Sequence, residues 1–351
     1  MFVILYGIKI FIFIVIIFYY ERPGYVMHIG APVQQRQNPF RIKKIFMSIY
    51  KELRQHGSIY LLALPGVGLL FLFNYLPMFG IIIAFKQLNL KSGIFASPWS
   101  NPWYYNFIYL IRNPNTVRAT RNTLLLNLAF MTFGTVFAVL FSLCLNEVKN
   151  RIVKRTAQSI SFLPYFVSWI VVSVFCYSIF SESSGALNRW MINMGQDKVA
   201  WYSSPQYWPF ILVVIHVWKM GGYNAVLYLA GLAGIDISYY EAADIDGANR
   251  LQKALYISIP MLMPTIVTLN LLAIGRIMNA DFGFFYGIIG DHALLFPTTD
   301  VLNTFIYRSL RQLGDVGMAS AAGFYQSVIA AILVLITNYI ANKKFENGGL
   351  F

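Results

Sequence analysis

The chain has 351 residues, of which 58% are hydrophobic and only 12% are charged, and its mean hydropathy is +0.58. A soluble globular protein carries about 25% charged residues, so this composition excludes a soluble class and predicts a chain that lies in lipid. The net charge is +13, but the basic residues lie in loops beside apolar segments. That placement argues against a nucleic-acid partner and for a role in membrane orientation.

Residues 1–38 form an apolar N-terminal segment followed by a linker rich in proline, glycine and glutamine. Three interpretations of the apolar part compete: an extra membrane anchor, an inefficient signal-like segment, or translated sequence upstream of a start at Met27 or Met47. Residues 39–57 then place apolar side chains on one helical face and basic side chains on the other. This pattern predicts an amphipathic helix that lies on an anionic membrane surface.

Six apolar segments follow, each long enough for a transmembrane helix of about 20 residues. They are Ile59–Phe85, Asn122–Leu145, Ile160–Phe180, Trp208–Leu232, Ile259–Met278 and Ala322–Ala341. We therefore predict an all-α polytopic membrane protein whose six-span domain covers residues 58–345, with a tail over 346–351. Prolines interrupt several of these segments, which membranes tolerate where neighbouring helices satisfy the freed backbone groups.

Lysine and arginine residues predict the orientation of the spans, because cytoplasmic loops carry an excess of basic residues. They cluster before the first span, after the second span over Lys149–Arg155, between the fourth and fifth spans at Arg250 and Lys253, and in the tail. With six spans, these segments all lie on one side. We therefore expect both ends of the six-span core to face the cytoplasm.

The stretch between the fourth and fifth spans predicts a helical hairpin. Ser238 and Glu241 have the spacing of a capping box at a helix start, and Gly247 ends the short helix as a residue free to adopt positive φ. A second short helix is predicted over Asn249–Ile257, and Pro260 stands where a new helix can begin. Helices this short are not stable alone in water, so the hairpin needs a groove on a partner.

This stretch resembles the signature loop of permease subunits of ATP-binding-cassette importers. The matching residues are Glu241, Ala242, Ala243, Asp246, Gly247, Ala248, Ile257 and Pro260. The one departure is Ile259, where the family usually has leucine. In that family the loop, residues 238–260 in this chain, docks onto a cytoplasmic ATPase subunit. The resemblance therefore implies a six-span importer-permease core with a cytoplasmic coupling-helix loop.

A wider resemblance runs from about Tyr60 to the end of the chain. Three stretches resemble the oligosaccharide-importer permeases of the lipoprotein/polysaccharide branch: LNEVKNRIVKRTAQSISFLPYFVSW, IGRIMNADFGFFY and TTDVLNTFIYRSLRQLGDVGMASAAGFYQS. This implies sugar import across a prokaryotic plasma membrane by a heterodimer of two permeases, with two ATPase subunits and an extracellular solute-binding protein. It also implies no cofactor in this chain, since ATP and Mg²⁺ belong to the partner ATPase.

Polar residues in the later spans are candidates for a substrate path, because a charge in hydrocarbon costs about 2.5–3.5 kcal/mol on insertion scales. The candidates are Trp218, Lys219, Tyr223, Asn224, Arg276, Asn279 and Asp281. Under one hypothesis they line a polar cavity that binds a sugar. Under the other, Lys219 extends its ammonium to the membrane surface and Arg276 pairs with Asp281.

The sequence contains no motif for catalysis or for ATP binding: G-x-x-x-x-G-K-[ST], H-E-x-x-H and G-x-S-x-G are all absent. The four histidines are far apart, and Cys144 and Cys176 lie in apolar segments, so neither a metal site nor a disulfide is predicted. We expect a transport subunit rather than an enzyme. Two alternatives are a stand-alone ion-coupled carrier or channel, which would show inverted repeats, and a membrane enzyme, which would need a polar catalytic cluster.

Overall fold

Helices are the only regular elements in the computed structural model, which describes residues 55, 57–89 and 91–344 of the chain. The all-α prediction is confirmed for this part. The predicted N-terminal segment over 1–38 and the tail over 346–351 lie outside the described residues. Nearly all of the predicted amphipathic helix over 39–57 does so as well.

The chain divides into two units after Ile82. The first unit contains α3 (Gly57–Leu70), the π-helical turn η1 (Phe71–Tyr75) and most of the 3₁₀ segment η2 (Leu76–Phe85). From Tyr60 to Phe85 these elements form one helical run apolar enough to cross a membrane. The first predicted span is therefore correct to within one residue.

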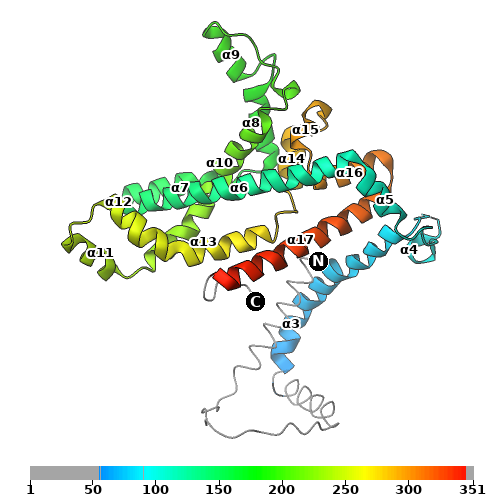
Figure 1. Cartoon of the computed structure of the whole chain (residues 1–351), viewed down its shortest axis with the longest axis horizontal. Coiled ribbons are helices and arrows are strands. Elements are labelled where there is room, and N and C mark those ends of the chain that lie inside the picture. Colours follow the sequence, from blue (N-terminus) through cyan, green and yellow to red (C-terminus); the bar gives the residue numbers. More distant parts are fainter. Residues whose placement is uncertain (1–54, 56, 90, 345–351) are drawn as a thin grey trace. The chain divides into compact units, whose positions relative to one another are not determined.

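The second unit holds the remaining helices, which Figure 1 follows by colour from cyan to red. In chain order they are α4 (Gly93–Ala96), α5 (Tyr105–Arg112), α6 (Pro114–Glu147), α7 (Arg151–Phe166), α8 (Trp169–Phe180), α9 (Ala186–Asn193), η3 (Trp201–Ser203), α10 (Trp208–Ala233), α11 (Ile237–Ile245), α12 (Arg250–Lys253), η4 (Ala254–Ser258), α13 (Ile259–Ile274), α14 (Phe282–Ile289), η5 (Ala293–Leu295), α15 (Phe296–Thr299), α16 (Leu302–Leu313) and α17 (Val316–Lys344).

Helix α10 is the packing centre of this unit and contacts α6, α7 and α13 (Figure 1). Glycines let its backbone approach its neighbours closely. A Cβ atom on Gly222 would lie 1.9 Å from the carbonyl oxygen of Ser161 in α7, and one on Gly221 would lie 2.6 Å from the Phe137 ring of α6. Small residues at contacts are typical of membrane helices, which gain little from the hydrophobic effect when they associate in lipid.

Five helical segments are long and apolar enough to cross a membrane, and one bent pair of helices makes a sixth. The predicted fourth span is confirmed, because α10 covers Trp208–Ala233. The predicted second and fifth spans begin too late, since their helices start at Pro114 and Arg250. Each start lies in polar sequence directly after an asparagine cap, and a hydropathy profile does not score such residues as part of a span.

The third predicted span, Ile160–Phe180, is wrong as a single helix, because α7 and α8 meet at an angle of 95°. Val167 and Ser168 have extended backbone at this break. The Ser168 hydroxyl then accepts a hydrogen bond from the N–H of Val171 at 3.4 Å and caps the new helix. Pro164 marks this segment as interrupted, but the residues around the break are mostly apolar, so hydropathy does not show that the backbone changes direction.

Candidate functional site

The loop between α10 and α13 contains the residues predicted for coupling. Its first helix, α11, begins at Ile237, and the carboxylate of Asp236 accepts a hydrogen bond from the N–H of Ser238 at 2.9 Å. The predicted capping box of Ser238 and Glu241 is therefore wrong, because Asp236 caps the helix two residues earlier. The same hydrogen bond lowers the pKa of Asp236, since it stabilises the charged carboxylate.

Gly247 ends α11 in the way that its position predicts. Its φ is +73°, and no atom lies within 4 Å of where a Cβ would be. The position therefore requires glycine for its backbone conformation and not for space. Two backbone hydrogen bonds close the turn, from Gly247 to the carbonyl of Asp244 at 3.1 Å and from Ala248 to the carbonyl of Ala243 at 2.9 Å.

The second arm of the hairpin is not the separate short helix that the sequence predicts over Asn249–Ile257. Helices α12, η4 and α13 follow one another without a break from Arg250 to Ile274, so this arm is the beginning of the fifth span. Asn249 and Gln252 form a reciprocal capping box, with hydrogen bonds of 2.9 and 2.7 Å between each side chain and the other's N–H. Pro260 lies in the first turn of α13.

Two side-chain contacts join the arms of the hairpin, and the sequence analysis anticipated neither. Lys253 donates a hydrogen bond to the carboxylate of Asp244 at 2.6 Å. The hydroxyls of Tyr240 and Ser258 lie 2.9 Å apart and share a hydrogen bond. Ser258 is buried at the end of the π-helical turn η4. Two polar contacts therefore connect the arm before Gly247 to the arm after it.

A third contact joins the hairpin to α6. The Arg250 guanidinium lies 3.6 Å from the carboxylate of Glu147, the last residue of α6. Both side chains are largely exposed, so this ion pair contributes little to stability. It nevertheless shows that the start of the fifth span and the end of the second span lie beside each other.

Several large apolar side chains of the hairpin are exposed. Ile245 is 87% exposed, and Ile237, Tyr239 and Leu251 are also exposed. Of the predicted coupling residues, Glu241, Ala242, Asp246, Gly247 and Pro260 are exposed, and Ala243, Ala248 and Ile257 are partly buried. Large apolar side chains gathered on a polar loop are typical of a surface that binds another protein.

The second group of predicted residues centres on the break between α7 and α8. Lys219 of α10 is only 5% exposed. Its ammonium donates hydrogen bonds to the carbonyl oxygens of Pro164 at 3.2 Å, Tyr165 at 2.8 Å and Val167 at 2.5 Å. These carbonyls lie at the C-terminal end of α7, which carries the negative end of the helix dipole. The Pro164 carbonyl also accepts a hydrogen bond from the N–H of Val167 at 3.2 Å. All three N–H bonds of the ammonium therefore have protein acceptors.

Trp169, at the start of α8, links Lys219 to Asp281. The Lys219 ammonium lies 4.8 Å from the centre of the Trp169 ring, a cation–π contact. The ring N–H of Trp169 donates to the Asp281 carboxylate at 2.7 Å, and this carboxylate also accepts from the N–H of Phe284 and caps α14. Helices α8, α10 and α14 thus meet at one polar contact chain, in which Trp169 was not predicted.

The other candidates are placed less closely around this break. The Tyr223 ring stacks on Tyr165, with centroids 4.4 Å apart and planes 9° apart. Trp218 and Arg276 are exposed, Asn224 is partly buried, and Asn279 accepts a hydrogen bond from Asn303 at 3.0 Å. No ion pair joins Arg276 to Asp281 in the part of the chain that the structure describes, so that hypothesis is not supported.

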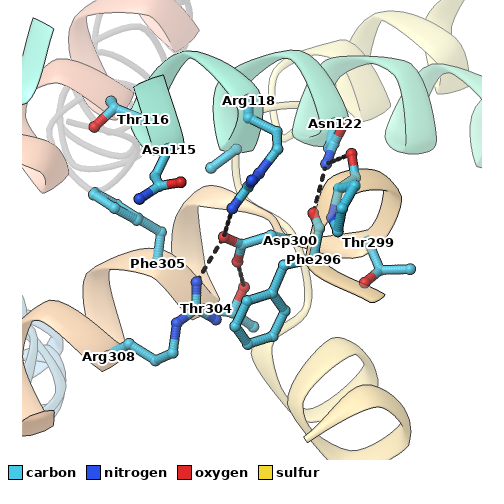
Figure 2. Close-up of polar contacts among 12 residues, drawn as sticks. Asn115, Thr116, Arg118, Asn122, Phe296, Thr299, Asp300, Thr304, Phe305 and Arg308 are labelled. Atoms are coloured by element: carbon cyan, nitrogen blue, oxygen red, sulfur yellow. Dashed lines mark hydrogen bonds and ion pairs between the residues drawn. The ribbon is translucent and has the colours of Figure 1, made fainter. Parts of the chain in front are cut away.

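A buried ion-pair cluster that the sequence analysis missed joins α6 to α16 (Figure 2). The side chain of Asp300 is 0% exposed, and its carboxylate lies 2.6 Å from the Arg308 guanidinium and 4.0 Å from that of Arg118. The Thr304 hydroxyl donates to the same carboxylate at 2.8 Å. Thr304 and Arg308 lie one turn apart in α16, and Asp300 lies just before that helix. The spacing of four residues between successive members was the available signal in the sequence.

This cluster holds the end of α6 that lies farthest along the helix from Glu147. The Arg308 guanidinium lies 4.0 Å from the centre of the Phe296 ring. Asn122 of α6 donates to the carbonyls of Phe296 and Pro297, at 3.4 and 3.2 Å (Figure 2). Helices α15 and α16 are therefore fixed to α6 by buried polar contacts, which are costly to break by removing one partner.

No group of three or more histidine, cysteine, aspartate or glutamate residues with metal-binding geometry occurs among the described residues. The polar clusters in the hairpin, at the α7–α8 break and around Asp300 consist instead of hydrogen bonds, ion pairs and caps. Their chemistry suits mechanical positioning and hydrogen bonding rather than bond making and breaking.

Comparison with known proteins agrees with this. A family model described as "Binding-protein-dependent transport system inner membrane component" matches residues 131–346, which is more than half of the chain. Protein LplB of Bacillus subtilis (strain 168) is 32% identical over 299 residues, covering 85% of this chain and 92% of the relative. The polygalacturonan/rhamnogalacturonan transport system permease protein YteP of the same organism is 29% identical over 300 residues, covering 86% and 92%.

A solved structure has the same fold. It is a chain of a bacterial alginate ABC transporter in complex with an alginate pentasaccharide-bound periplasmic protein. That chain is 29% identical to this one, with a TM-score of 0.75, and the match covers 84% of this chain and 97% of that chain. The likeness therefore extends over nearly the whole of the six-span core.

Proposed function

The chain belongs to the family of binding-protein-dependent transport system inner membrane components, and from this premise we propose that it carries oligosaccharides inward while a separate ATPase drives the cycle. It is a multi-pass membrane protein and a transport subunit. The observation that carries the proposal is the braced hairpin of α11 and α12. This hairpin continues directly into two membrane spans and exposes an apolar face.

The exposed face of the hairpin is the proposed ATPase contact. Ile237, Tyr239 and Ile245 are all more than half exposed in this chain. Burial of such side chains is worth about 25 cal/mol per Å² of apolar surface, so a matching groove on an ATPase subunit would gain from covering them. Glu241 lies on the same helix and offers a carboxylate to a basic group on that partner.

The contacts around the hairpin support its action as a lever. The Asp244–Lys253 and Tyr240–Ser258 contacts hold the two arms together. The hairpin also follows α10 and leads into α13 without a flexible linker. Movement of the ATPase surface would therefore pass to the spans as a rigid displacement, and alternating access of a central cavity would follow.

The assembly that we propose contains a second permease, two ATPase subunits and an extracellular solute-binding protein. A periplasmic protein is present in the similar solved complex, which supports the last of these partners. ATP and Mg²⁺ would bind to the ATPase subunits. The clustering of basic residues supports a cytoplasmic position for the hairpin and for both ends of the six-span core.

We propose the class of cargo from the names of the similar proteins. YteP is named for transport of polygalacturonan and rhamnogalacturonan, and the solved relative is a chain of an alginate ABC transporter. These are saccharide polymers, and both names include acidic ones. An oligosaccharide is therefore the favoured class of cargo for this chain.

The test is a substitution at Gly247 in the assembled transporter. Gly247→Val forces a β-branched residue to a φ of +73°, which costs about 1–3 kcal/mol locally and should distort the hairpin. We expect ATP-dependent uptake of labelled oligosaccharide to be lost, while the protein remains inserted and ATPase binding weakens. The measurements are uptake into cells and co-purification with the ATPase.

The matched control is Gly314→Val, at another positive-φ glycine after a helix, with φ +66° and no atom near its Cβ position. It imposes the same kind of strain far along the chain from the hairpin, so uptake should persist. Normal uptake by Gly247→Val would contradict the lever. Transport by the purified chain alone in liposomes would instead favour a stand-alone carrier.

A further inference from the structure

A cavity of about 450 Å³ lies at the end of α8, between the loops around α9 and the loop before η5. Its volume falls within the range of about 300–1,000 Å³ that is usual for small-molecule sites. Three of its walls are rings: Tyr177, Tyr202 and His292. Ser183, Glu182 and Lys198 add a hydroxyl, a carboxylate and an ammonium.

The ring wall rests on a rigid base. The Tyr202 ring lies 4.9 Å from that of His292 and 6.1 Å from that of Tyr177, centre to centre. On its other side it packs 4.9 Å from the ring of Trp208. Trp208 is fully buried and donates its ring N–H to the carbonyl of Trp201 at 2.8 Å. The wall is therefore held in place before any ligand arrives.

Apart from the hydroxyls of Ser181 and Ser183, which lie 3.5 Å apart and share a hydrogen bond, the polar side chains of the cavity have no partner within the described part of the protein. Among the described residues, no hydrogen bond or ion pair involves the side chains of Tyr177, Glu182, Lys198, Tyr202 or His292, and the three rings contact their neighbours by ring packing. Burial raises the pKa of Tyr202, and the neighbouring Cys176 and Tyr177 raise it further. Its hydroxyl therefore stays protonated and remains a hydrogen-bond donor as well as an acceptor.

The cavity lies at the opposite end of α10 from the coupling hairpin. Tyr202 contacts Trp208, the first residue of α10, and the hairpin follows the last residue, Ala233. A helix of 26 residues is about 39 Å long at about 1.5 Å per residue, which exceeds the hydrocarbon thickness of about 30 Å. If the hairpin meets an ATPase in the cytoplasm, the cavity faces the side from which cargo arrives.

We propose that this cavity is an entry site for one or two sugar units of an oligosaccharide, a proposal that rests on the proposed function. A pyranose has an apolar face of C–H groups and a rim of hydroxyls, so it matches tilted rings that are surrounded by unused donors and acceptors. An apolar ligand would leave Glu182 and Lys198 unpaired. A small inorganic anion would meet the Glu182 carboxylate and would make no use of the rings.

The test places a thiol in the cavity of the complete transporter in intact cells. Ser183→Cys is made in a Cys144→Ser background, because Cys144 is exposed and Cys176 is buried. The rate of modification by a membrane-impermeant maleimide is measured with and without trigalacturonate, arabinotriose or maltotriose as probes. We expect at least one probe to slow modification about fivefold or more.

Two matched variants localise the effect. Asp197→Cys places the thiol in the loop on the other side of α9, outside the cavity lining, and its modification should be unaffected by the probes. Adding Tyr177→Ala to Ser183→Cys removes one ring and should raise the probe concentration needed for protection roughly twofold to twelvefold, since an aromatic contact is worth about 0.5–1.5 kcal/mol. Tyr104→Ala, at an exposed tyrosine that does not line the cavity, should leave that concentration unchanged.

The outcomes separate this site from the transport proposal. ATP-dependent uptake of a probe that gives no protection overturns the cavity site and leaves the permease function standing. Protection by a probe in cells that cannot take it up supports the site and counts against transport of that saccharide. Protection that needs the solute-binding protein and no saccharide makes the cavity a protein contact and overturns the proposal.

Discussion

Two lysine side chains lie buried beside apolar segments, and each donates to carbonyl oxygens at a helix end. Lys219 does this at the end of α7, beside Trp169. Lys86 does the same at the end of α4, where its ammonium lies 3.1 and 2.6 Å from the carbonyls of Ile94 and Phe95. Its ammonium also lies 5.3 Å from the centre of a tryptophan ring, that of Trp99. In both places the lysine ammonium donates hydrogen bonds to carbonyl oxygens at a helix C-terminus, where few backbone N–H donors are within reach.

Lys219→Met should therefore destabilise the protein rather than only weaken cargo binding. The change removes the ammonium donor from three carbonyls, of which only that of Pro164 keeps a backbone donor, the N–H of Val167. Loss of hydrogen bonds to a charged group costs about 1.5–3 kcal/mol. We expect a lower temperature of heat inactivation in detergent and reduced uptake. Heat inactivation of the purified transporter is the primary measurement.

Two further variants make this prediction specific. Lys91→Met removes a lysine that is exposed in the structure, and its heat inactivation should match that of the unmodified protein. Lys219→Arg keeps several N–H donors and should recover part of the loss. A Lys219→Met variant with normal heat stability but a raised KM for acidic saccharides would instead place Lys219 in the substrate path.

At the scale of single helices, the cap of α11 is the most direct place to test by substitution what stabilises the hairpin. Asp236→Ala removes the acceptor for the N–H of Ser238, so the first turn of α11 should open more often. Amide hydrogen exchange over Ile237–Ile245 should become faster, with a parallel loss of ATPase co-purification. Asp236→Asn keeps an acceptor oxygen and should exchange nearly as slowly as the unmodified helix.

The pH dependence of the same helix has a defined direction. The pKa of Asp236 is lower in the folded protein than its usual value of 3.8, because the N–H of Ser238 stabilises the carboxylate. The stabilisation of α11 by the ionised Asp236 is therefore complete above pH 3.8. It is lost as the pH falls through the pKa of Asp236 in the folded protein. The Asp236→Asn helix should lack this acid-induced opening, and equal acid sensitivity in both proteins would contradict the capping role.

The helices show which structure could be predicted from the sequence. Positive φ at Gly247 was predictable, because only glycine adopts it at little cost and because small residues precede it. The fold class followed from composition and from long apolar runs. The break between α7 and α8 was not predictable, because Val167 and Ser168 mark no change in hydropathy.

The features that could not be predicted depend on contacts between residues far apart in the sequence. Lys219 was recognised as a charge that needs a reason, but its acceptors are carbonyls more than fifty positions earlier in the chain. Backbone oxygens have no residue signature, so no motif could identify them. For Asp300, the spacing to Thr304 and Arg308 was visible in the sequence, whereas the approach of Arg118 required the packing of α16 on α6.

For the whole molecule, the sharpest prediction concerns sidedness. Ile245 on the hairpin and Asp197 in the loop after α9 are both exposed and are separated by the full length of α10. In a Cys144→Ser background, Asp197→Cys should react with an impermeant maleimide in intact cells. Ile245→Cys should react only after the membrane is opened.

Reaction of Ile245→Cys from outside intact cells would place the hairpin where no cytoplasmic ATPase could reach it. The proposed coupling would then be untenable, whatever the substrate. Reaction of both positions from one side would mean that α10 does not cross the membrane, in conflict with its length of 26 residues.

Neither half of the bent third span is long enough to cross a membrane by itself. Helices α7 and α8 contain 16 and 12 residues, or about 24 and 18 Å, against about 30 Å of hydrocarbon. Straightening the bend between α7 and α8 would move three carbonyls away from Lys219 and leave its ammonium without acceptors in the hydrocarbon. We therefore expect α7 and α8 to move as one body during transport, with the change in backbone conformation confined to the loops before α7 and after α8.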